Sequence, residues 1–153
     1  MSQAHLDQRT VTSPLYERDL YAWVQEQVAL LRAGRLGEID AENIAEEISD
    51  VGSNEYDKLE SALRVLLAHM LKWDHQPEKR TRSWENTIAE QRRRTHRQLR
   101  RNPSLKAELD EALREGFASA RLLASTETEF ELDRFPESCP YDWEAILDRP
   151  FKR

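Results

Sequence analysis

The sequence predicts an all-α protein, folded as an antiparallel helical bundle of four to five helices with a short C-terminal helical segment. Composition is one reason, because the 153 residues include only four glycines and are rich in Leu, Ala, Glu and Arg, which favour helix over sheet. Periodicity is the other, because apolar residues recur at steps of three and four, as on one helix face. A chain of this length can bury one core. We therefore expect a flexible lead over residues 1–12 and a single domain over residues 13–153.

The first helix is expected to begin at Ser13-Pro14 and to end at Gly34. A serine hydroxyl can cap a helix, proline is tolerated at the first helical position, and glycine commonly follows the last turn. Between these points one apolar stripe predicts the face that packs in the core. Its members are Tyr16, Leu20, Trp23, Val24 and Leu31.

The central helices are expected to meet at a kink or break near Gly52. Asp40 can cap a helix with an apolar stripe made of Ile44, Ile48 and Val51. The next stripe begins at Tyr56, and the step of five residues shifts it by about 100° around the helix. A glycine in the gap makes a break the simplest explanation. From Tyr56 to Trp73 the apolar arc is wide, which indicates the helix at the centre of the bundle.

The rest of the chain predicts two further long helices and a short last one. Ser83 can cap the third helix, and Asn102-Pro103 ends it and starts the next. That next helix carries small residues four apart, which let a neighbouring backbone approach closely. They are Ala112, Gly116 and Ala120. Pro140 can begin the last helix, and we expect the segment from Phe135 to Phe151 to wrap over the bundle.

A series of short motifs follows in order along most of the chain. They are Tyr16-Glu17, Asp19, Trp23, Leu31-Arg32, Glu46-Glu47-Ile48, His69-Met70-Leu71-Lys72-Trp73, Ser83-Trp84, Arg92, Asn102-Pro103-Ser104-Leu105, Phe135-Pro136 and Cys139-Pro140-Tyr141. In order and spacing this series resembles the bacterial domain of unknown function 29 family, from about Tyr16 to Phe151. The resemblance implies an uncharacterised all-helical bacterial protein and supplies no activity, cofactor or catalytic residue.

Basic side chains are concentrated between residues 72 and 101. This segment has ten basic and four acidic side chains, so it carries +6 while the rest of the chain carries −12. A basic surface on helix 92–101 could contact nucleic-acid phosphates; its members are Arg93, Arg94, Arg97 and Arg101. The net charge of −6 disfavours that interpretation. We expect the basic segment to pair instead with the acidic stretch from Glu38 to Glu60, within one chain or between subunits.

A smaller polar set is predicted nearer the core. Arg92 lies beside its apolar stripe, so we expect it to be partly buried and to need a carboxylate partner. Glu47 and Asp50 flank the stripe of their own helix, and His69 lies at the edge of the wide central arc. These four residues could converge in one pocket. The pocket could bind a polar or anionic ligand or transfer a proton, or it could be a buried network that sets helix register, which we favour.

The sequence contains no recognised motif for metal, cofactor or phosphate-loop binding. None of the four histidines follows a glutamate by three residues, and the His-Glu-x-x-His motif is absent. Cys139 could be a nucleophile beside His69, but a lone cysteine in a proline-bounded turn is more typical of a packing residue. We expect no metal site and no cofactor, and we name no catalytic residue.

The cysteine count indicates the compartment. With Cys139 alone no intramolecular disulfide can form, as is typical of the reducing cytoplasm. No segment approaches the roughly 20 apolar residues of a membrane span, and the N-terminus does not resemble a secretory signal. We expect a cytoplasmic, non-catalytic interaction module that forms a homo-oligomer or binds a protein partner. Two alternatives stay open: a small-molecule-binding protein or enzyme using Glu47, His69 and Arg92, and nucleic-acid binding through helix 92–101.

Overall fold

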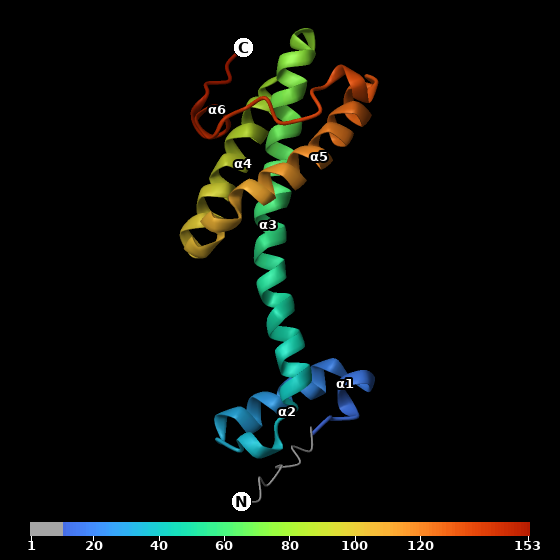
Figure 1. Ribbon diagram of the computed structural model, residues 1–153, viewed down its shortest axis with the longest axis vertical. Helices are drawn as coiled ribbons and strands as arrows, with labels where there is room; N and C mark the ends of the chain where they lie inside the picture. The colour runs from blue at the N-terminus through green and yellow to red at the C-terminus, as the bar shows by residue number, and fades with distance from the viewer. Residues whose placement is uncertain (1–10) are drawn as a thin grey trace, which may run out of the picture. The chain divides into compact units, whose positions relative to one another are not determined.

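The computed structural model describes residues 11–153 and confirms the all-α class, with no strand in this part of the chain. Its elements are α1 (Leu15–Arg18), α2 (Leu20–Arg32), α3 (Ala41–His75), α4 (Arg82–Arg101), α5 (Leu109–Thr128) and α6 (Trp143–Asp148), with four short 3₁₀ turns between them (Figure 1). The chain divides into two compact units, one ending at Ser53 and the other covering Asn54–Arg153. Most of the expected lead over residues 1–12 lies outside the described residues.

The first unit contains two helices where the sequence predicted one. Asp19 interrupts the expected helix with φ −155° and ψ 86°, and its carboxylate caps α2 by accepting a hydrogen bond from the Ala22 N–H at 2.9 Å. An aspartate favours such a cap because its carboxylate satisfies a free N–H of the first turn. The predicted end of the helix is correct, since Gly34 adopts φ +68° directly after it.

A buried carboxylate holds the first unit together. Asp40 is fully buried and accepts hydrogen bonds from the Ser13 N–H at 2.9 Å, the Trp23 indole at 3.2 Å and the Asn43 amide at 2.8 Å. The Asp40 N–H in turn donates to Gln27 Oε1 at 2.8 Å. Burial raises the pKa of Asp40, but these hydrogen bonds outweigh it and hold the pKa below its ordinary value. The sequence predicted Asp40 only as the cap of α3. In the structure Asp40 also joins three segments of the unit.

The predicted kink near Gly52 is wrong, because α3 is one uninterrupted helix from Ala41 to His75. Gly52 has an ordinary negative φ and nothing within 4 Å of the place where a Cβ would stand. The slip in the apolar stripe has another cause. It marks the boundary between the two units, where exposed Val51 gives way to Tyr56, which packs against the core of the second unit.

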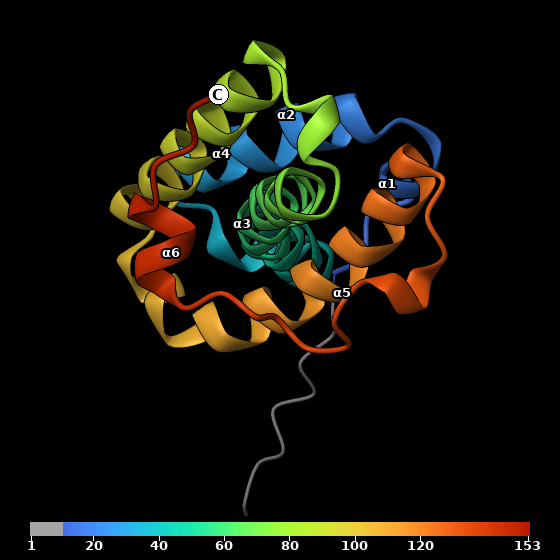
Figure 2. The same cartoon turned by 90° about the horizontal axis from the view of Figure 1, so that it is seen from above.

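In the second unit α3 lies between α4 and α5 (Figure 2). Helix α4 runs antiparallel to α3, since its Gln98 reaches Glu55 while Trp84 lies 4.5 Å from the ammonium of Lys72. Its cap is the hydroxyl of Thr81, which accepts a hydrogen bond from the Trp84 N–H, rather than the predicted Ser83.

The small residues of α5 allow the predicted close approach to α3. Ala112, Gly116 and Ala120 are all buried. A Cβ on Gly116 would lie 3.3 Å from the Glu60 carbonyl oxygen and 3.3 Å from the Leu63 Cβ. A side chain at this position would therefore press on α3, and the two helices would have to shift slightly apart to accommodate it.

The C-terminal segment packs onto the core of the second unit, as predicted. Phe135, Ile146 and Phe151 are buried members of that core. Asp142 rather than Pro140 begins α6, through a hydrogen bond from the Ala145 N–H at 2.8 Å. The start of α6 is thus determined by a side-chain cap that follows the turn containing Pro140.

Candidate functional site

The residues of the predicted polar pocket are divided between the two units. Glu47 and Asp50 belong to the first unit, whereas His69 and Arg92 belong to the second. Glu47 accepts a hydrogen bond from the Tyr16 hydroxyl at 2.9 Å, which raises the pKa of Tyr16 to about 12, and Asp50 is exposed. Glu47 and His69 both belong to α3.

His69 and Arg92 have separate structural partners within the second unit. The Nδ1 of His69 lies 2.9 Å from the Val65 carbonyl, one turn earlier on α3. Burial lowers the pKa of His69, and nearby Lys72 lowers it further, against the opposite effects of the Val65 hydrogen bond and Glu127. His69 is thus held as a neutral ring near pH 7.

Arg92 is half-buried as predicted, but its partners are carbonyls. The guanidinium donates to the Ile146 oxygen at 2.8 Å and to the Ala145 oxygen at 3.0 Å, and it lies 5.1 Å from the Phe151 ring. A cation at the C-terminus of α6 is favourable because the last carbonyls of a helix carry partial negative charge. The prediction of a carboxylate partner for Arg92 was wrong, because the free carbonyls of α6 accept its hydrogen bonds instead. The sequence pattern of α4 gives no indication of these carbonyls.

Two of the basic residues of α4 pair within their own helix. Arg93 and Arg94 bind Glu90 at 2.9 Å and 3.0 Å. Arg97 and Arg101 are exposed and form no ion pair among residues 11–153. Within the second unit α4 contacts the acidic stretch Glu38–Glu60 through the uncharged Gln98 and Asn102, which donate to Glu55.

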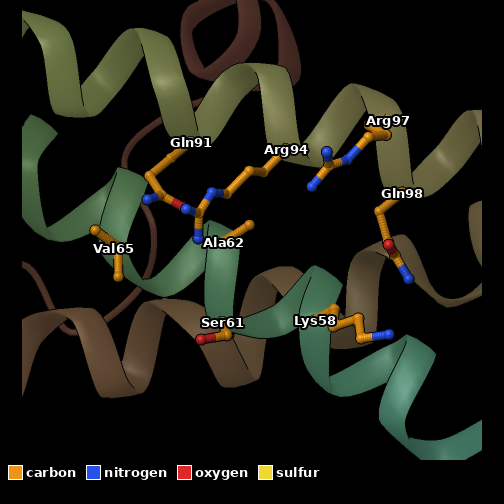
Figure 3. A pocket seen from close by; sticks show the side chains of 8 residues that line it. All are labelled: Lys58, Ser61, Ala62, Val65, Gln91, Arg94, Arg97 and Gln98. Atoms are coloured by element: carbon orange, nitrogen blue, oxygen red, sulfur yellow. The ribbon is translucent and has the colours of Figure 1, made fainter.

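A groove between α3 and α4 gathers part of this basic surface in one place. It has a volume of about 220 Å³ (Figure 3). Arg94 and Arg97 extend over it from α4, and Lys58 borders it from α3. Its floor is apolar and its walls carry amide and hydroxyl groups; these residues are Ala62, Val65, Gln91, Gln98 and Ser61. Sequence reasoning included Arg94 and Arg97 but missed Lys58, because only the pairing of the two helices aligns it with them.

A second surface lies on α2, where the structure leaves most of the predicted core stripe exposed. Trp23 is buried, but Leu20, Val24 and Leu31 are not, and Tyr21 is 77% exposed. With half-buried Val28 these side chains cover an arc of about 100° on one side of α2. An arc of that width ordinarily faces a core.

Helix α3 continues this pattern within the first unit. Ile48 and Val51 are 66% and 63% exposed. All residues from Ile48 to Asn54 are exposed, which is about two turns of helix. Eight of the ten large apolar side chains exposed in residues 11–153 lie at or before Val51.

The described residues contain no group of three or more His, Cys, Asp and Glu side chains placed to bind a metal ion. Cys139 is half-buried, which raises the pKa of its thiol, and its sulfur lies 3.5 Å from the Tyr141 carbonyl. A raised thiol pKa opposes the thiolate form that a nucleophile needs. Among residues 11–153, no helix is both apolar and long enough to span a bilayer.

Comparison with known proteins gives a family and no function. No curated protein matches the chain. No solved structure matches it either. One family model does match, over residues 15–152, nearly the whole chain. The chain belongs to the family described as domain of unknown function DUF29.

Proposed function

We propose that this chain is a non-catalytic interaction module of the bacterial cytoplasm, and that it self-associates through α2. The observation that carries the proposal is the apolar arc of α2, which is as wide as a core-facing stripe and is left exposed. Helices of this length are marginal in water unless an apolar face is covered. A second copy of the chain would supply the missing cover.

The charges around α2 favour an antiparallel pair. Glu17 and Asp19 stand at its start, and Arg32 and Arg35 stand at its end. Two copies packed antiparallel therefore bring the acidic start of one helix beside the basic end of the other. Residues 15–35 carry three acidic and three basic side chains, so net charge does not oppose the pairing.

The same antiparallel arrangement places apolar side chains of one copy opposite apolar side chains of the other. In an antiparallel pair centred near residue 26, Leu20 of one copy lies opposite Leu31 of the second copy, and Val24 lies opposite Val28. A two-fold pair of this kind closes on itself, so it yields a dimer rather than a filament. The 13 residues of α2 span only about 20 Å, so the interface is small and we expect a weak dimer.

Sedimentation velocity and light scattering, from micromolar to near-millimolar protein, test the proposal. We expect the wild-type chain to shift from monomer to dimer, and Val24→Glu to remain a monomer with unchanged helical circular dichroism. Leu122→Glu is the matched control, because Leu122 is 59% exposed on α5 of the second unit. It should dimerise like the wild type.

A charge swap tests the antiparallel direction. Arg32→Glu should weaken the dimer, because it places like charges beside Glu17 and Asp19 of the second copy. Adding Glu17→Arg to that variant should restore dimerisation. A wild-type chain that stays monomeric at every concentration contradicts the proposal, and so does a Leu122→Glu variant that loses the dimer as completely as Val24→Glu.

A further inference from the structure

The groove between α3 and α4 has an unusual charge pattern. Lys58, Arg94 and Arg97 all line it, and its lining contains no Asp or Glu among the described residues. Three cations around one depression repel each other unless solvent or an anion screens them. Lys58 and Arg94 are each paired with a carboxylate that does not line the groove, so Arg97 is the lining cation that has no ion pair among residues 11–153.

The two nearest carboxylates are already engaged outside the groove. Glu55 accepts hydrogen bonds from Lys58, Gln98 and Asn102, and these bonds lower its pKa to about 2. Glu90 accepts hydrogen bonds from Arg93 and Arg94, which likewise lower its pKa to about 2.

These pairs still leave donors directed at the groove. Arg94 uses its Nε atom on Glu90, so its terminal N–H groups stay available. Arg97 has no ion pair among residues 11–153. Each guanidinium has five N–H donors in a planar fork that matches an oxyanion.

We propose that this groove binds the phosphate group of a small phosphorylated molecule. Arg94 and Arg97 would bind the phosphate oxygens, Lys58 would add charge, and Ser61 and Gln91 would hydrogen-bond to the attached polar group (Figure 3). The volume of about 220 Å³ is below the range of about 300–1,000 Å³ typical of sites for drug-sized ligands. It suits a phosphate with a small attached group such as a sugar.

A nucleic acid is the less favoured ligand. A polyanion would contact the whole exposed basic row of α4, including Arg100 and Arg101, which do not line the groove. It would also approach a chain with a net charge of −6. A small phosphorylated ligand needs only the groove, so the two cases predict different mutational patterns.

The test is an NMR titration of the full chain that follows the Arg Nε–Hε signals and backbone amides of α3 and α4. The probes are inorganic phosphate, ribose 5-phosphate and, as an uncharged analogue, ribose. We expect saturable shifts at Arg94 and Arg97 with the two phosphates and none with ribose. Arg97→Gln should weaken binding at least tenfold, and Lys58→Gln several-fold. Arg100→Gln, the matched control on the same helix outside the groove, should change it less than twofold.

Three results would overturn the proposal. The first is the absence of saturable binding of either phosphate at low ionic strength. The second is equal weakening by Arg97→Gln and Arg100→Gln, which indicates unspecific counterion binding. The third is binding of a single-stranded oligonucleotide, weakened equally by both variants, in the absence of ribose 5-phosphate binding. Light scattering on the same samples measures dimerisation through α2 independently of phosphate binding, because neither substitution lies on α2.

Discussion

The two units of this chain differ in how they use apolar side chains. The second unit holds seventeen of the eighteen buried apolar residues of the described chain, and the first unit holds only Trp23. The first unit instead carries most of the exposed large apolar residues and relies on the buried carboxylate of Asp40. Burial of apolar surface is the dominant stabilising contribution in folding. The second unit therefore contains nearly all of the apolar core, whereas the first unit leaves most of its large apolar side chains exposed.

The two units also differ in net charge. Residues 1–53 carry ten acidic and four basic side chains, for a net −6, whereas residues 54–153 are balanced at nineteen of each. The −6 of the whole chain is thus the charge of the first unit. Within the balanced second unit, the basic side chains cluster on α4, and this local excess makes the groove a candidate anion site.

The largest expected effect comes from removing the carboxylate of the first unit. Asp40→Ala leaves the Trp23 indole and the Ser13 N–H without their acceptor, and we expect a loss of about 3 kcal/mol of stability in that unit. Hydrogen exchange followed by mass spectrometry should show lost protection in α2 with α5 unchanged. Asp50→Ala, at an exposed carboxylate of the same unit, is the control. Equal loss of protection in α5 would show that the two units do not differ in this way.

An intermediate effect is expected at the closest helix contact of the second unit. Gly116→Leu forces a side chain against the α3 backbone and should cost about 1–3 kcal/mol in the free energy of unfolding. Gly52→Leu is the matched control, since Gly52 is a helical glycine with nothing within 4 Å of its Cβ position. We expect it to be neutral or slightly stabilising, because leucine is the better helix former. Chemical denaturation measures both, and similar costs at the two glycines would contradict the packing argument.

The smallest expected effect is a pH dependence from His69. Its pKa is lowered in the folded chain, first by burial, so the unfolded chain binds the proton more readily. Stability from this group is therefore complete above the unfolded pKa of about 6.5 and is lost as the pH falls toward the lower folded pKa. His69→Gln should flatten the unfolding free energy between pH 7 and pH 5. An unchanged slope in that variant would mean that groups other than His69 govern the dependence.

The predicted helices were mostly correct because their signals are local. A helix cap or a helix breaker affects only the few residues next to it, so it can be identified from the local sequence. Examples are the cap at Asp40 and the breakers at Gly34 and Asn102-Pro103. The regular spacing of small residues on α5 is also visible in the local sequence. Some errors were local, such as the missed cap at Asp19, and others arose where a distant segment decides. A carbonyl of α6 rather than a carboxylate satisfies Arg92, and no pattern within α4 could have indicated that.

The sequence by itself determined the helical class, the positions of most helix ends and the clustering of basic residues near α4, because propensity, capping and charge are properties of neighbouring residues. Only the tertiary structure decided which apolar stripes are buried. The stripes of α2 and α3 are similar in sequence to those of any core helix, but burial depends on whether another element lies against them. In this chain Leu63 and Leu66 have such neighbours, and Val24 and Ile48 do not. The same pairing of distant segments aligned Lys58 with Arg94 and Arg97 in one groove.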